Sequence, residues 1–145
     1  MDKDVNALAG EVIGAAIEVH RALGPGLLES AYQAALEHEL SLRGLRWVAE
    51  MPITASYKGR TLECAYRLDL FVEDCLVVEL KSVTELLPIH KAQLLTYLRL
   101  TGQSLGLLIN FNVSVLHKGI CRVVLNLDPL RDLRVSASSA LRDEG

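Results

Sequence analysis

The chain has 145 residues, of which 50% are hydrophobic and 23% are charged, which suits one globular domain with a single core. The formal net charge of −3 excludes a protein that holds nucleic acid by overall positive charge. Any contact with nucleic acid must therefore be local, assisted by a metal ion or made through a partner.

The sequence predicts neither a membrane-spanning segment nor a signal peptide. No apolar run is long enough to cross a bilayer, and Met1-Asp2-Lys3-Asp4 lacks the positive start and the apolar stretch of a signal peptide. We therefore expect a cytoplasmic protein with no membrane partner. Cys64, Cys75 and Cys121 are an odd number of cysteines without metal-finger spacing, which favours buried, reduced thiols.

Two helices are predicted at the start of the chain. Residues 5–23 carry apolar side chains at helical spacing, and Gly24-Pro25-Gly26 ends this helix. Residues 27–42 form the second helix. Glu29 lies in its first turn, where the helix dipole favours a carboxylate, so its simplest role is to stabilise its own helix.

Three strands follow, at residues 48–57, 62–72 and 76–81, where the apolar pattern changes to that of strands. The turns between them, Lys58-Gly59-Arg60 and Glu73-Asp74-Cys75, are short. Strands joined by turns of this length must form an antiparallel meander.

A third helix is expected next. Ser82-Val83-Thr84-Glu85 has the form of a capping box and Pro88 suits a first helical turn, so the helix runs from about there to Leu100. Residues 105–111 are largely apolar, which is typical of a strand covered on both faces. Because this strand follows a crossover helix, it should lie parallel to a core strand.

The end of the chain is predicted to contain a hairpin and a tail. Residues 113–117 and 120–127 read as two strands joined at Lys118-Gly119. Residues 128–145 form a polar tail that we expect to be peripheral.

Three charged residues lie inside the otherwise apolar second and third strands: Asp69, Glu79 and Lys81. Alternation places Glu79 and Lys81 on the same face of their strand. If the turn after residue 72 has an odd number of residues or carries a bulge, Asp69 lies opposite Glu79; a two-residue turn would place them on opposite faces.

Two carboxylates held this close repel each other unless a cation lies between them, and oxygen ligands with water suit Mg²⁺ or Mn²⁺. A neighbouring lysine can orient a water molecule or stabilise charge that develops on a phosphate. The same residues, together with Arg67, could instead form a cross-strand ladder of ion pairs.

These residues belong to a longer pattern that runs along the chain. In order, it consists of Gly26-x-x-Glu29-x-x-Tyr32, Asp69…Glu79-x-Lys81, Gln93-x-x-x-Tyr97 and Asn110-Phe111. The pattern resembles the GxxExxY protein family, a branch of the PD-(D/E)XK nuclease superfamily, over nearly the whole chain from about Glu11 to Leu127. Leu68 stands where the superfamily motif has its proline, and Asn112 stands where the family often has glycine.

The resemblance implies a single nuclease-like domain over residues 1–145, with its core at residues 5–127. The implied fold class is α/β, a restriction-endonuclease-like αβββαβ core with an extra N-terminal helix and a C-terminal hairpin. Asp69, Glu79 and Glu29 would hold the metal ion and Lys81 would be the catalytic lysine. Gln93 and Tyr97, which share a helix face, would border the site and help to position a phosphate or a water.

The function implied is that of a hydrolase: a Mg²⁺- or Mn²⁺-dependent nuclease that cuts phosphodiester bonds in DNA or RNA. The rival is a non-catalytic module that retains the fold and binds nucleic acid or protein. The acidic net charge and the lack of a basic stripe favour the rival, whereas the intact Asp…Glu-x-Lys set favours the enzyme. The sequence leaves open whether the chain forms a homo-oligomer or binds a protein partner.

Overall fold

A computed structural model describes residues 4–126, apart from the side chains of Cys64 and Ala65. Its elements are α1 (Val5–Leu23), α2 (Glu29–Leu42), β1 (Trp47–Tyr57), β2 (Arg60–Val72), β3 (Leu76–Lys81), α3 (Pro88–Thr101), β4 (Leu105–Asn110), the 3-10 helix η1 (Leu116–Gly119) and β5 (Ile120–Val124). Within these residues, no helix combines the length and the apolar character needed to cross a bilayer.

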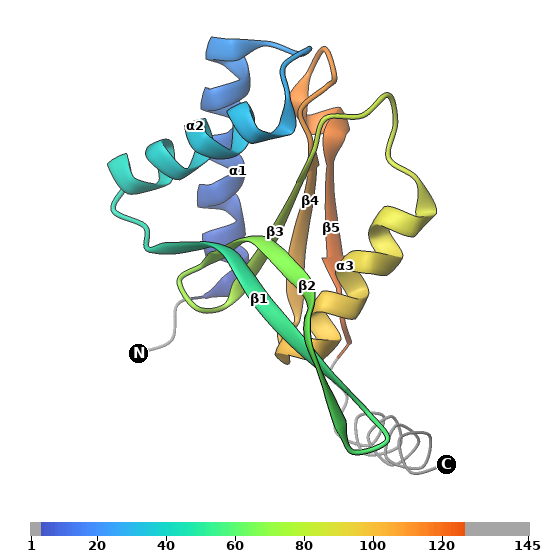
Figure 1. Cartoon of the computed structure of the whole chain (residues 1–145). Coiled ribbons are helices and arrows are strands. Elements are labelled where there is room, and N and C mark those ends of the chain that lie inside the picture. The colour runs from blue at the N-terminus through green and yellow to red at the C-terminus, as the bar shows by residue number, and fades with distance from the viewer. Residues whose placement is uncertain (1–3, 127–145) are drawn as a thin grey trace.

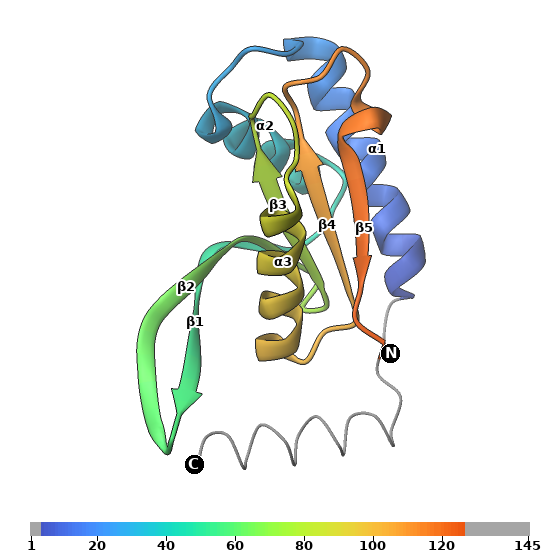
Figure 2. The same cartoon turned by 90° about the vertical axis from the view of Figure 1, so that its right-hand side faces the viewer.

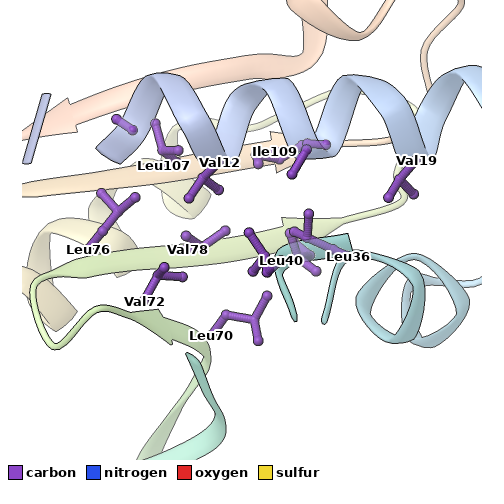
Figure 3. Close-up of a cluster of buried hydrophobic side chains, with 14 of the residues drawn as sticks. Val12, Val19, Leu36, Leu40, Leu70, Val72, Leu76, Val78, Leu107 and Ile109 are labelled. Atoms are coloured by element: carbon purple, nitrogen blue, oxygen red, sulfur yellow. The ribbon is translucent and has the colours of Figure 1, made fainter. Parts of the chain in front are cut away.

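A five-stranded sheet in the order β1-β2-β3-β4-β5 carries helices on both faces (Figures 1 and 2). Helices α1 and α2 cover one face, where Val12, Leu36 and Leu40 pack against apolar side chains of the sheet (Figure 3). Helix α3 covers the other face through Leu94 and Leu98. The central strands are therefore buried on both sides, as their apolar sequence predicts.

The predicted meander and the parallel strand are confirmed. Strand β2 pairs antiparallel with β1 and with β3, and β4 pairs parallel with β3. The turn between β2 and β3 has three residues and pairs Val72 with Leu76. This register is the one that brings Asp69 and Glu79 to the same face of the sheet.

The predicted strand at residues 113–117 is wrong. After Asn110 the chain bends and enters η1, and β5 pairs antiparallel with β4 instead. The buried side chain of Asn110 explains the bend, because its Oδ1 accepts the Asn112 N–H (3.1 Å) and turns the backbone away from the sheet. The predicted tail at residues 128–145 lies outside the described residues.

Three smaller expectations also differ from the structure. Helix α3 begins at Pro88, as predicted, but the predicted capping box Ser82-Val83-Thr84-Glu85 does not cap it, and the Leu87 N–H donates instead to Nδ1 of His90 (2.9 Å). Strand β2 begins two residues earlier than predicted, at Arg60. Cys75 and Cys121 are half-buried and not buried as predicted.

Candidate active site between β2 and β3

Asp69 of β2 and Glu79 of β3 lie side by side, one residue beyond the last regular pair of the two strands, Leu70 and Val78. The Asp69 N–H donates to Glu79 Oε1 (3.0 Å), and the Leu80 N–H donates to Asp69 Oδ2 (2.8 Å). At this position the two strands are joined by bonds from backbone N–H groups to side-chain carboxylates and not to backbone carbonyls. Backbone amides of the sheet therefore fix the position of both side chains.

Burial makes two negative charges unfavourable at this position. Glu79 is only 5% exposed, and burial followed by the charge of Asp69 raises its pKa to about 8. Burial also raises the pKa of Asp69, while the hydrogen bond from Leu80 acts in the opposite direction. Without a cation, burial and the charge of Asp69 therefore favour the protonated form of Glu79 at neutral pH.

Lys81 and Glu29 reach the same region from two different elements. Lys81 is half-buried two residues beyond Glu79, and its positive charge favours the ionised forms of Asp69, Glu79 and Glu29 by lowering their pKa values. Glu29 lies in the first turn of α2, as predicted. Burial raises the pKa of Glu29, and the charge of Asp69 raises it further.

The donor set fits a hard divalent cation, but it is not a complete cage of side chains. Within residues 4–126, no three His, Cys, Asp or Glu side chains are arranged so that they could hold one ion together. Glu29 is therefore near the carboxylate pair without completing it in this conformation. Since Mg²⁺ keeps several waters and is often bound through one or two carboxylates, the chemistry of Asp69 and Glu79 fits such an ion.

The segment that presents Glu29 is held by Tyr32, one turn further along α2. The buried Tyr32 hydroxyl donates to the Gly24 carbonyl and accepts the Leu27 N–H (3.1 Å). Its ring stacks on Phe111, with centroids 4.5 Å apart and an interplanar angle of 7°. The tyrosine of the Gly26-x-x-Glu29-x-x-Tyr32 motif thus fixes the entry into α2.

The same segment is attached to the end of β3. Gly26 has φ of 98°, a conformation that favours glycine, and it leads the chain into α2. Ser82, directly after Lys81, donates its hydroxyl to the Leu27 carbonyl (2.7 Å). This bond ties the loop before Glu29 to the strand end that carries Lys81.

Asn110 at the end of β4 holds the chain that follows Lys81. Its side-chain amide donates to the Val83 carbonyl and accepts the Val83 N–H, both at 3.0 Å. Asn110 also lies beside Lys81 in the parallel register of β3 and β4. The Asn110-Phe111 part of the sequence pattern therefore acts by positioning the strand end and the Tyr32 ring.

Tyr97 and Gln93 border the carboxylate pair from α3, on the face of the sheet that lies opposite α1 and α2. The Gln93 side chain hydrogen-bonds Tyr97, whose side chain is buried. Burial, followed by the charges of Glu79 and Asp69, raises the pKa of Tyr97 to about 12. The Tyr97 hydroxyl therefore keeps its proton and lies in the field of both carboxylates.

Glu50 of β1 is a charged residue of this region that the sequence does not reveal. It falls between the β1–β2 pairs on either side of Asp69, and its φ is 54°. Its charge raises the pKa values of Asp69 and Glu29. Gln33 of α2 donates to Glu50 Oε1 (3.4 Å) and to the Asp69 carbonyl (3.2 Å), so that α2, β1 and β2 meet here.

The alternative ladder of ion pairs is not formed within residues 4–126. The salt bridges among these residues join Arg21 to Glu18, Arg43 to Glu39, and Arg46 to Glu73 and Asp74. None of them includes the candidate site. Arg67, which a ladder would require, is exposed.

Comparisons with known proteins address the family and the fold of the chain. A sequence model of the PD-(D/E)XK nuclease superfamily matches residues 6–123. The chain is also similar to a solved structure titled "Crystal structure of SSO0001", at 20% identity and a TM-score of 0.53. That match covers 78% of this chain but only 58% of the other, and at this identity it shows the fold alone. No curated protein matches the chain. Since the match to the superfamily extends over most of its length, the chain belongs to the PD-(D/E)XK nuclease superfamily.

Proposed function

We propose that the chain is a divalent-metal-dependent nuclease of the GxxExxY type that hydrolyses phosphodiester bonds in nucleic acid. The observation that carries the proposal is the pair of adjacent carboxylates, Asp69 and Glu79, in the field of Lys81. A buried acidic pair with raised pKa values is unfavourable when both carboxylates are ionised. A cation between the two carboxylates would offset their repulsion.

Asp69 and Glu79 would hold Mg²⁺ or Mn²⁺, and Glu29, whose pKa is raised by the charge of Asp69, would join them after a movement of its side chain. When bound, such an ion supplies Lewis-acid catalysis and lowers the pKa of a bound water. The Lys81 ammonium group would stabilise negative charge that develops on the phosphate. The protonated Tyr97 hydroxyl, held by Gln93, would donate a hydrogen bond to a phosphate oxygen or to the attacking water.

The test is an assay of single- and double-stranded DNA and RNA in Mg²⁺, in Mn²⁺ and in chelator. We expect cleavage of at least one of the four substrates with either metal and none in chelator. Asp69→Asn should abolish that cleavage. Intact substrates in all metal conditions, with a folded protein at micromolar concentration, would contradict the proposal.

A second candidate function is a non-catalytic module that binds nucleic acid or protein. The observation that favours it is the hydrogen bonding of the pair, since backbone amides already satisfy an oxygen of each carboxylate and Glu79 is almost fully buried. Such a module would bind its partner equally well in metal and in chelator. It would also retain its binding after Asp69→Asn.

A further inference from the structure

The β1–β2 hairpin extends beyond the rest of the sheet as a two-stranded ribbon (Figures 1 and 2). We define the arm as residues 52–67. Strand β1 lies at the edge of the sheet, and β3 pairs with β2 only from Leu70 to Val72. Within residues 4–126, no other strand therefore flanks the arm.

The arm is locally positive in a chain of net charge −3. It carries Lys58, Arg60 and Arg67 against one carboxylate, Glu63. All three cations are exposed, and none forms a salt bridge with another residue of the described part of the chain. Among residues 4–126, no carboxylate therefore pairs with these charges.

Exposed apolar side chains accompany the cations. Tyr57 is 55% exposed and Leu62 is 43% exposed. Tyr57 pairs with Arg60, and the Ala55–Leu62 pair is two positions away, so Tyr57, Arg60 and Leu62 share a face of the ribbon. The Lys58 ammonium lies 5.4 Å from the centre of the Tyr57 ring. A cation held near an exposed ring gives the tip of the arm one positively charged, partly apolar surface.

The base of the arm touches the candidate active site. The Tyr66 ring meets the Tyr97 ring edge-on, with centroids 5.5 Å apart. Arg60, at the tip, precedes Asp69 by nine residues, which corresponds to a reach of about 30 Å along the strand. A ligand that occupies the site can therefore continue along the arm.

We propose that the arm holds double-stranded DNA whose scissile phosphate lies at Asp69 and Glu79, an inference that rests on the proposed nuclease function. The major groove of B-form DNA admits a two-stranded β-ribbon, whereas that of A-form RNA is too deep and narrow. The reach of the arm is close to one helical turn of DNA, about 34 Å. An acidic protein needs such a local positive contact to approach a polyanion.

The test compares two double variants that make the same change in charge. Lys58→Glu/Arg60→Glu reverses the tip of the arm, and Lys118→Glu/Arg122→Glu reverses exposed cations near the opposite edge of the sheet. Fluorescence anisotropy in chelator measures the affinity for labelled DNA duplexes of about 30 base pairs, roughly three turns. Circular dichroism confirms that both variants are folded.

We expect the arm variant to bind the DNA duplex at least tenfold more weakly than the wild type. The slope of its log affinity against log salt concentration should decrease by the equivalent of about two phosphate contacts. The control variant should stay within twofold of the wild type. Binding to an RNA duplex or a single strand of equal length should depend less on the arm.

Several results would overturn the inference. The first is a wild-type protein that does not bind the DNA duplex. The second is an arm variant that binds this duplex as tightly as the control variant does. The third is an equal loss of affinity of the arm variant for an RNA duplex or for single strands. A change in self-association by light scattering without a change in DNA binding would assign the arm to a second copy of the chain. Arm-dependent binding without any cleavage in Mg²⁺ would contradict only the proposed nuclease function.

Discussion

Glu79 combines deep burial with a second carboxyl group beside it, and both features raise its pKa to about 8. Its folded state therefore binds a proton more tightly than the unfolded chain, where the group titrates near its usual value of 4.5. The resulting stability is fully present below pH 4.5 and is lost as the pH rises through about 8. In chelator, the melting temperature should consequently decrease as the pH is raised from 4.5 to about 8.

Glu79→Gln should remove most of this pH dependence, because glutamine resembles the protonated acid. Thermal unfolding in chelator across the same pH range measures it. Glu85→Gln is the matched control, since Glu85 is exposed. A slope that survives in Glu79→Gln would show that other groups cause it.

Asp69 provides the corresponding prediction for metal binding. Mg²⁺ or Mn²⁺ should raise the melting temperature by binding the folded state only, and Asp69→Asn should abolish the rise. Asp74→Asn makes the same chemical change in the exposed β2–β3 turn and should keep the rise. If the metal response is unchanged in both Asp69→Asn and Glu79→Gln, the ion binds elsewhere.

At the scale of elements, the two turns of the meander explain why the sequence can predict the Asp69–Glu79 pair but not the position of Glu50. The β2–β3 turn has three residues and no irregularity follows it, so counting from the turn brings Asp69 and Glu79 together. The β1–β2 ladder shifts register between Ile53 and Ala55. Counting from that turn would pair Glu50 with Arg67, whereas the shift places it beside Asp69.

The connection from β4 to β5 shows a different limit of the sequence. Val113 and Val115 alternate with polar residues, and this pattern predicts a strand where the structure has a bend and η1. Hydrogen bonds of a single buried side chain, Asn110, decide the actual path. The apolar periodicity of a sequence does not predict such a bond, because it depends on the spacing of apolar side chains and not on hydrogen-bond acceptors.

Gly119 tests this connection directly. A methyl group on its α-carbon would overlap the backbone carbonyl of Asn110, which cannot move without disturbing β4. Gly119→Ala should lower the free energy of unfolding by about 1–3 kcal/mol. Gly10→Ala is the control, because Gly10 is exposed in α1 with open space around it, and this change should raise stability by up to about 1 kcal/mol. Denaturant unfolding measures both, and an unaffected Gly119→Ala would contradict the tight packing described.

At the scale of the whole molecule, the sequence predicts the helices, the meander and the parallel strand, because long apolar patterns with clear breaks define them. The arm is not foreseen, since its projection follows from where β3 stops pairing with β2. The acidic net charge also hides it, because its positive residues are few, with Lys58 and Arg60 at the tip and Arg67 at the base.

The central claim is that Lys81 acts on a phosphate next to a metal-binding pair of carboxylates. The most direct measurement is the single-turnover cleavage rate of Lys81→Met in Mg²⁺, on a nucleic acid that the native protein cuts, with Lys91→Met of the exposed face of α3 as control. A charge directed at the transition state contributes about 3 kcal/mol, so Lys81→Met should cleave at least about a hundredfold more slowly while keeping its fold and its metal-induced rise in melting temperature. Lys91→Met should cleave like the wild type. Cleavage by Lys81→Met at the wild-type rate would remove the lysine from the mechanism and contradict the account.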